Sequence, residues 1–292
     1  MEAALHITRF PVSNYNLGST LASGQCFRWI EKDGGWIGVV GNHWLRLEQS
    51  PREIIVRSPQ PMPDWSFVAD FLQAGQDLRK ILRTFPDDPP MQAAVRGCPG
   101  LRLLRQEPWE CLASFILSST KQIVQIRQII ALLCERFGES LAVPAGESPA
   151  WAFPTATRLA RLRESDLRAC KMGFRAPYLL GTARRIADGT FDLQSLHDMR
   201  VHEARQQLVT LPGVGPKIAD CVLLFGYGFQ SAFPIDVWIL KALRQLYFPD
   251  REPGTLELQE FASTHFGPHA GYAQQYLFHY MRTIHDAPPV GT

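Results

Sequence analysis

Hydrophobic and polar positions alternate with a period of two along the first sixty residues, and this pattern predicts short β-strands. Turn residues such as Asp33-Gly34-Gly35 separate the apolar runs. Because short turns join neighbouring runs, the simplest arrangement is an antiparallel sheet that extends to about Pro61. The predicted strands are Gln25–Trp29, Gly35–Val40, His43–Leu47 and Glu53–Arg57.

The period then changes to that of amphipathic helices. Apolar residues recur at helical spacing between Trp65 and Leu72 and again between Leu78 and Leu82. From Glu107 onward the pattern is almost wholly helical. The predicted helices are Glu110–Leu117, Ile123–Phe137, Thr155–Arg163, Arg175–Asp188, Val201–Leu211, Pro216–Phe225, Val237–Tyr247 and His269–Ile284. We therefore predict an α+β fold, in which an N-terminal β-sheet domain with a helix (1–106) precedes an all-helical domain (107–286).

Composition excludes some classes of protein but does not identify the function. The chain has 292 residues, a hydrophobic fraction of 46% and a net charge of +2, so it can build a core and is no polycation. Its six cysteines are irregularly spaced without a C-x-x-C pair, which argues against a metal or an iron–sulfur cluster. No signal-peptide pattern and no apolar run near ~18 residues occurs, so we expect no membrane association. We expect a cytoplasmic, nucleoid-associated protein if the source is bacterial and a nuclear protein if it is eukaryotic.

The segment from Leu211 to Lys217 has the pattern of a tight hairpin between two amphipathic helices. Gly213 and Gly215 flank Val214 and can adopt backbone conformations closed to other residues, and Pro216 suits a first helical position. Outward backbone N–H groups at such a corner can hold a phosphate. The hairpin 211–216 therefore predicts DNA-backbone binding without sequence readout. In a pure binding module, Lys217 would be one more phosphate contact.

A carboxylate, Asp236, follows Lys217 in the sequence and could act together with it. Asp236 comes nineteen positions after Lys217 and directly before the predicted helix Val237–Tyr247. It could serve only as the N-cap of that helix. It could also face the lysine across a cleft, and an amine beside a carboxylate is the pair that nucleophilic cleavage of a glycosidic bond needs.

These features resemble the helix-hairpin-helix–Gly/Pro–Asp DNA glycosylase superfamily and, within it, the 8-oxoguanine DNA glycosylase/AP lyase family. Three further segments resemble that family: Ser23-Gly24-Gln25-Cys26-Phe27-Arg28-Trp29, Pro108-Trp109-Glu110-Cys111-Leu112-Ala113-Ser114-Phe115-Ile116, and Ala270-Gly271-Tyr272-Ala273-Gln274 with Leu277-Phe278. The likeness runs from about residue 12 to 285. It implies a TBP-like N-terminal sheet domain followed by the helical glycosylase domain.

The resemblance implies a bifunctional enzyme that flips an oxidised purine, 8-oxoguanine, out of duplex DNA and excises it. Lys217 would attack C1′ and form a Schiff base, and β-elimination would then cut the strand. Asp236 would stabilise the cationic sugar. The lysine must lose its proton to attack. The chemistry needs no cofactor, although the hairpin carbonyls could hold a monovalent cation. We expect double-stranded DNA as the partner and a monomeric protein.

The resemblance also implies a pocket for the extruded base. Cys221 and Phe278 would sandwich the base, and Gln274 would bond its Watson–Crick edge. The Gly24 carbonyl would accept the N7–H that only oxidised guanine carries. Taken singly, each residue also has an ordinary interpretation: a turn glycine, a core thiol, a surface amide and a core ring.

Phe174-Arg175 resembles the family's aromatic–arginine pair, which wedges the base stack and reads the opposite cytosine. Three positions depart from the family pattern. Thr120 stands where an asparagine is common, Gln125 replaces a cytosine-reading arginine, and Trp238 stands where a histidine is common. The preference for cytosine opposite the lesion is therefore left open.

Two other functions share some of these features. An oxidised-pyrimidine glycosylase/lyase would have the same hairpin, lysine and aspartate, but that group commonly carries a four-cysteine cluster near the C-terminus. No cysteine follows Cys221 in this chain. A non-catalytic helix-hairpin-helix DNA-binding protein would need neither Lys217 nor Asp236.

Overall fold

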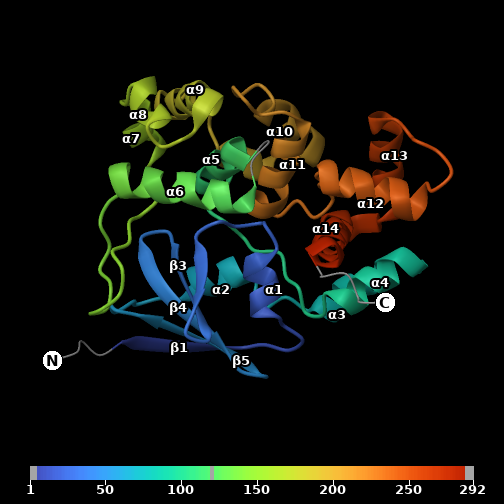
Figure 1. The fold of residues 1–292 in the computed structure, drawn as a ribbon, viewed down its shortest axis with the longest axis horizontal. Coiled ribbons are helices and arrows are strands. Elements are labelled where there is room, and N and C mark those ends of the chain that lie inside the picture. Colours follow the sequence, from blue (N-terminus) through green and yellow to red (C-terminus); the bar gives the residue numbers. More distant parts are fainter. Residues whose placement is uncertain (1–4, 119–121, 287–292) are drawn as a thin grey trace.

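A five-stranded antiparallel sheet forms the N-terminal part of the chain (Figure 1). The computed structural model describes residues 5–118 and 122–286. The strand order is β1-β5-β4-β3-β2, so the first strand lies at one edge of the sheet and pairs with the last strand. The strands are β1 His6–Pro11, β2 Trp29–Lys32, β3 Gly35–Val40, β4 His43–Gln49 and β5 Glu53–Ser58. The predicted antiparallel sheet is confirmed.

The first thirty residues differ from the predicted pattern. Helix α1 (Leu17–Ala22) was not predicted; the side chain of Asn16 caps it by accepting from the Ser19 N–H at 2.8 Å. The predicted strand Gln25–Trp29 is wrong before Trp29, where β2 begins. The Gln25 side chain instead forms two hydrogen bonds with a loop. It donates to the Arg102 carbonyl at 2.8 Å and accepts from the Leu104 N–H at 2.7 Å.

The rest of the chain is mainly helical, which confirms the predicted α+β order of a sheet followed by a larger helical region. The predicted helix Thr155–Arg163 is too long, because α7 ends at Ala160, and α4, α8 and α13 were not predicted. A π-helical segment, Leu223–Tyr227, continues α11. The helices are α2 Ser66–Leu72, α3 Leu78–Leu82, α4 Pro89–Gly97, α5 Pro108–Ser118, α6 Ile123–Phe137, α7 Ala156–Ala160, α8 Glu164–Arg168, α9 Ala176–Ala187, α10 Val201–Leu208, α11 Pro216–Val222, α12 Val237–Tyr247, α13 Thr255–His265 and α14 Ala270–Asp286.

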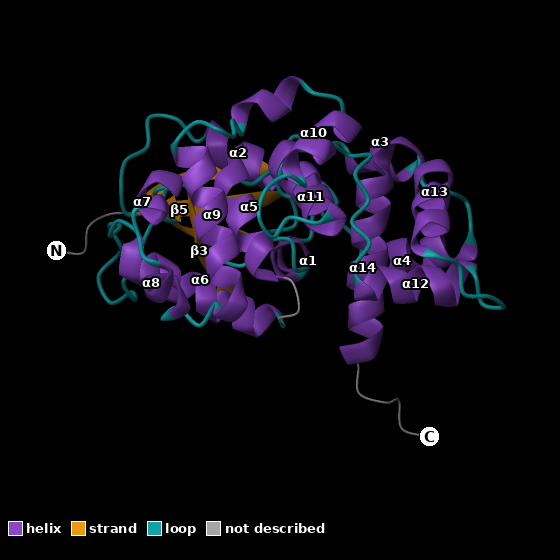
Figure 2. Ribbon diagram, turned by 90° about the horizontal axis from the view of Figure 1, so that it is seen from above, coloured by secondary structure: helices purple, strands orange, loops and turns teal. Residues whose placement is uncertain are grey.

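Two apolar cores stabilise the molecule, and they do not divide the chain at a single position. One lies between the sheet and α1–α2. The other fills the helical region and also takes in Leu78 and Ile81 of α3 and Met91 and Ala94 of α4. Figure 2 shows α3 and α4 on the side of α14, away from the sheet, and α4 packs against α14. The division of the chain near residue 106 stays a prediction.

Among the helices in the described part of the chain, none is both long and apolar enough to cross a membrane.

Candidate active site

A cleft of about 920 Å³ collects residues from the loop after α1 and from segments in or next to α5, α6, α11, α12, α13 and α14. Four of the sequence-predicted site residues line it: Lys217, Asp236, Gly24 and Phe278. Among its other lining residues, Trp238 was named from the sequence as a departure from the family pattern, Phe27 and Phe115 were included only as members of motifs, and an additional cation was given no role. These other lining residues include Phe27, Phe115, Ile123, Val237 and Arg282.

Lys217 is the second residue of α11, and the hairpin before it sets its direction. Gly213 has φ +75°, and a Cβ there would lie 2.7 Å from the Cβ of Tyr178, so only glycine fits. Pro216 occupies the first turn of the helix. The Lys217 Nζ lies 5.5 Å from the centre of the Phe115 ring. The amine thus lies beside an aromatic wall.

Phe115 belongs to a packed aromatic group that fixes this wall. Its ring stacks on Phe225 with centroids 5.6 Å apart and meets Phe27 edge-on at 5.7 Å. Behind the lysine, the Asp220 carboxylate accepts a hydrogen bond from the Arg205 Nε at 2.6 Å and ties α11 to α10. The lysine helix is therefore held on both sides.

Asp236 caps α12 and also lines the cleft. Its carboxylate accepts from the backbone N–H groups of Trp238 at 3.0 Å and Ile239 at 2.9 Å. Burial raises the pKa of this carboxyl above its ordinary value, while the Ile239 N–H and the Lys217 charge act in the opposite direction. The two interpretations of Asp236 therefore do not exclude each other.

Gly24 lies at a point of close approach between the N-terminal loop and the cleft wall. Its φ is +80°, and a Cβ there would lie 3.0 Å from Ile123 Cδ1 and 3.3 Å from the Phe278 ring. The residues around it are tied down on both sides. Gln275 Nε2 donates to the Ser23 carbonyl at 2.9 Å, and Gln106 Nε2 donates to the Gln25 carbonyl at 2.7 Å.

One face of α14 presents a stripe of three residues at four-residue spacing: Gln274, Phe278 and Arg282. Gln274 is buried, and its Oε1 has no hydrogen-bond partner in the described part of the chain. The Arg282 guanidinium lies 5.6 Å from the centre of the Phe278 ring. Along the helix, the stripe therefore consists of the buried Gln274 amide, then the Phe278 ring and then the Arg282 cation.

Cys221 lies one turn after Lys217 on α11 and is buried. Burial raises the pKa of its thiol to about 12, against the opposing charge of Lys217. Cys221 and Gln274 do not line the cleft as it stands. The structure thus brings four of the six predicted catalytic and pocket residues together and leaves two buried behind them.

The residues predicted to contact DNA are placed differently from one another. Phe174 is 57% exposed, whereas Arg175 is 1% exposed with its guanidinium 4.4 Å from the Phe174 ring. Burial lowers the Arg175 pKa. Gln125 is exposed on α6, where its Oε1 accepts from the Gln122 N–H at 3.3 Å. Thr120 lies outside the described residues.

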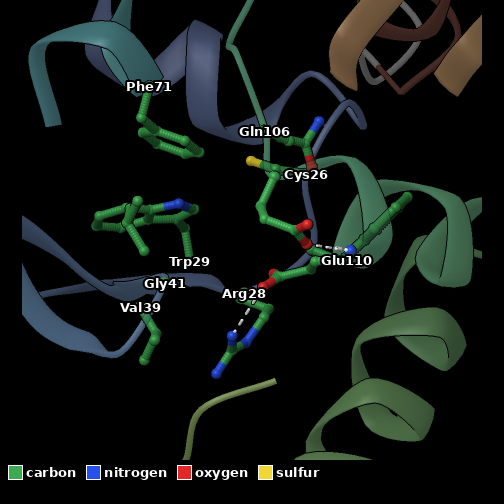
Figure 3. Close-up of a pocket in the computed structure, with 11 residues that line it drawn as sticks. Cys26, Arg28, Trp29, Val39, Gly41, Phe71, Gln106 and Glu110 are labelled. Carbon is green, nitrogen blue, oxygen red and sulfur yellow. Dashed lines mark hydrogen bonds and ion pairs between the residues drawn. The ribbon is translucent and has the colours of Figure 1, made fainter. Parts of the chain in front are cut away.

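A second, much smaller cavity of about 30 Å³ lies between the sheet and α5 (Figure 3). Arg28 points toward Glu110 there, with Nη1 3.1 Å from the carboxylate. The arginine also donates to the Trp151 carbonyl. This cavity cannot admit a base, and its charged residues join the two regions of the molecule. In the described ranges, no cluster of three histidine, cysteine or acidic side chains could hold a metal ion.

Comparison with known proteins places both parts of the chain. Residues 7–112 match the 8-oxoguanine DNA glycosylase N-terminal domain, and residues 113–267 match the HhH-GPD superfamily of base excision DNA repair proteins. The chain is 32% identical to the N-glycosylase/DNA lyase OGG1 of Arabidopsis thaliana, over 89% of this chain and 75% of that protein. It is 30% identical to a probable N-glycosylase/DNA lyase of Methanothermobacter thermautotrophicus, over 94% and 96%.

A solved structure agrees with these matches. The 8-oxoguanine glycosylase/lyase of Clostridium acetobutylicum, in complex with double-stranded DNA containing cytosine opposite 8-oxoguanine, superposes with a TM-score of 0.89. The two sequences are 30% identical, and the match covers 97% of this chain and 99% of that one.

Proposed function

The chain belongs to the N-glycosylase/DNA lyase family within the HhH-GPD superfamily of base excision DNA repair proteins, and we propose that it excises 8-oxoguanine from duplex DNA and then cuts the strand through Lys217 and Asp236. The observation that carries the assignment of these two residues is their joint presence in one cleft with Gly24 and Phe278. A non-catalytic DNA-binding module would have no use for that arrangement.

The proposed reaction begins when the neutral Lys217 amine attacks C1′ of the flipped nucleotide. The new N–C1′ bond replaces the bond to the base, and opening of the sugar ring gives a Schiff base. Loss of a C2′ proton then breaks the C3′–O bond and releases the 3′ phosphate. Asp236, when ionised, stabilises the positive charge that develops on the sugar. Its two backbone N–H donors fix the direction of the carboxylate.

The same proposal assigns the base pocket. The Gly24 carbonyl accepts the N7–H of 8-oxoguanine, and the tied backbone on both sides of Gly24 keeps that acceptor in place. Gln274 Oε1 is a buried acceptor that lacks a partner in the described structure, and guanine offers N–H donors on its Watson–Crick edge. A base lying between Phe278 and Cys221 requires the cleft to extend toward the thiol.

DNA binding is assigned to the hairpin Gly213-Val214-Gly215 and to the exposed ring of Phe174, with the protein acting as a monomer on duplex DNA. Phe174 is free to enter the base stack, but Arg175 must turn outward before it can meet an opposite base. Gln125 is proposed to contact the same DNA, and Thr120, which lies outside the described residues, is assigned to DNA binding on the family resemblance alone. These two departures from the family pattern predict a weaker preference for cytosine.

We further propose that a monovalent cation binds carbonyl oxygens of the hairpin when DNA is present. The Leu211 carbonyl accepts from the Val214 N–H at 3.1 Å, and the Pro212 carbonyl accepts from Thr182 Oγ1 at 3.2 Å. Each carbonyl oxygen keeps a second lone pair, and such oxygens suit a hard cation. Replacing K⁺ by Li⁺ at constant ionic strength should then weaken DNA binding.

The decisive test is covalent trapping with borohydride, which reduces the Schiff base between enzyme and DNA. Wild-type protein should be trapped on duplexes that contain 8-oxoguanine, and Lys217→Gln should not be trapped while it still binds the duplex. Duplexes with thymine glycol or undamaged bases serve as the comparison. Trapping by Lys217→Gln would remove the lysine from the mechanism, and cleavage of thymine glycol alone would favour the oxidised-pyrimidine enzyme.

A further inference from the structure

Arg282 is a cation of the cleft to which nothing so far assigns a role. It lines the cleft that holds Lys217 and Asp236, and it comes one turn after Phe278 on α14. Its Nη1 would lie 3.5 Å from a Cβ on Gly24, so the guanidinium reaches across to the N-terminal loop. Within the described residues it forms no ion pair, in contrast to Arg28 or Arg205.

The order of residues along α14 shows which part of a nucleotide Arg282 would meet. Gln274 is buried at the base end of the stripe, Phe278 is half-buried, and Arg282 is partly exposed near the helix end. A flipped nucleotide enters base first, so its sugar stays beside Lys217 and Asp236 and its flanking phosphates stay outermost. The partly exposed end of the stripe is therefore where the phosphates pass.

Other groups of the cleft are poorly suited to hold a phosphate. Two of the first N–H groups of α12, those of Trp238 and Ile239, already donate to Asp236. Asp236 itself repels a phosphate. Lys217 must be neutral to attack, so it cannot serve as a permanent cation for the backbone. A guanidinium stays charged at all relevant pH values and can donate two parallel bonds to phosphate oxygens.

We propose that Arg282 binds one of the two phosphates that flank the flipped nucleotide and thereby positions the sugar between Lys217 and Asp236. The inference rests on the proposed function, because it takes the cleft as the site of the flipped nucleotide. Stacking on Phe278 holds the guanidinium at the mouth of the cleft. Arg282 is accordingly a phosphate-binding residue rather than a reader of the base.

The test uses a duplex in which a tetrahydrofuran abasic analogue replaces the lesion, since binding to it needs neither a base nor chemistry. Arg282→Gln should weaken binding about 10-fold or more, and the slope of log K against log salt should fall by about 0.9, the value for one lost phosphate contact. Arg282→Lys should restore much of the affinity. Arg9→Gln, on the outer strand β1, controls for a general loss of positive charge.

The phosphate is identified by replacing it, one position at a time, with an uncharged methylphosphonate on either side of the analogue. At one of the two positions the replacement should weaken wild-type binding but leave Arg282→Gln binding unchanged. Equal losses for both proteins at both positions would overturn the proposal. So would an effect of Arg282→Gln confined to duplexes carrying 8-oxoguanine, which would make it a base contact. Failure of the wild-type protein to excise 8-oxoguanine would instead refute the proposed function.

Discussion

Under the proposed mechanism, Asp236 would combine two roles at one side chain. As an N-cap it must accept hydrogen bonds from backbone N–H groups, and as a catalytic carboxylate it must stay ionised beside the sugar. Burial works against the ionised form, whereas the two N–H donors and the neighbouring cations favour it. The cap therefore also helps to keep the carboxylate charged in a partly dry site.

A pH dependence follows from this balance. Because burial raises the pKa of Asp236, the Asp236 carboxyl should titrate at higher pH than an ordinary aspartate. The positive charge of Arg282 lowers that pKa, so Arg282→Gln should move the titration to still higher pH. Carbon NMR of the Asp236 carboxyl between about pH 3 and pH 8, with Asp236→Asn to assign the signal, measures both effects separately from the protonation of Lys217, which also lowers the excision rate. An Asp236 titration that Arg282→Gln leaves unmoved, or moves to lower pH, would contradict this account.

At the residue scale, the sequence predicted those site residues that stand in short local patterns. Lys217 and Asp236 stand in recognisable local patterns, a hairpin and a helix cap. Arg282 and Gln275 do not, because their importance depends on where α14 meets the N-terminal loop. The Gln275–Ser23 hydrogen bond joins residues 252 positions apart, and no local pattern encodes such a pairing.

At the element scale, α14 serves the site with more than one face. Phe278 and Arg282 of the stripe line the cleft and Gln274 lies buried behind them, while Gln275 reaches the Ser23 carbonyl next to Gly24. The helix therefore fixes both the ring wall of the pocket and the backbone that carries the proposed N7–H acceptor. Discrimination of 8-oxoguanine from guanine is thus expected to depend on the position of α14.

Gln275→Leu tests this dependence. It leaves the buried Ser23 carbonyl without its donor, which we expect to cost about 1–3 kcal/mol and to displace Gly24. Discrimination between duplexes with 8-oxoguanine and with guanine, measured by competitive binding, should fall about 10-fold. Borohydride trapping on an abasic site needs no base recognition and should remain near wild type. A variant with full discrimination would show that Gln275 has no part in placing Gly24.

Sequence periodicity located many of the elements that bury a continuous apolar face, but it missed α4, which also buries apolar residues. Strand β3 and helices α6 and α12 have their predicted bounds. Helix α4 begins with two prolines, which in the sequence suggest a loop. Together with the Asp88 N-cap before them, they mark the start of a helix. The segment Gln25–Arg28 has the alternation of a strand, but its polar groups bond to residues near position 104 instead.

At the scale of the whole molecule, the Arg28–Glu110 ion pair joins the sheet region to the first helix of the helical region. Both side chains are mostly buried, and burial raises the pKa of Glu110 while Arg28 opposes that shift. Removing one partner would leave the other charge desolvated and unpaired.

Arg28→Met should therefore lower the free energy of unfolding by about 3–5 kcal/mol, measured by urea denaturation at neutral pH. The loss should be smaller at low pH, because protonation of Glu110 removes the unpaired charge. The double variant Arg28→Met with Glu110→Leu should recover much of the stability. If the double variant is no more stable than Arg28→Met alone, the unpaired carboxylate is not the cause.

The packing of α4 against α14 has a consequence during synthesis. A ribosome releases the N-terminal sheet early, yet the apolar face of α4 stays uncovered until α14 has emerged. Lys217, the proposed nucleophile, is also translated before the helix that supplies the ring and cation of its cleft. An incomplete chain would thus expose an apolar surface that chaperones and proteases can bind. It also could not yet form the cleft in which DNA would be cut.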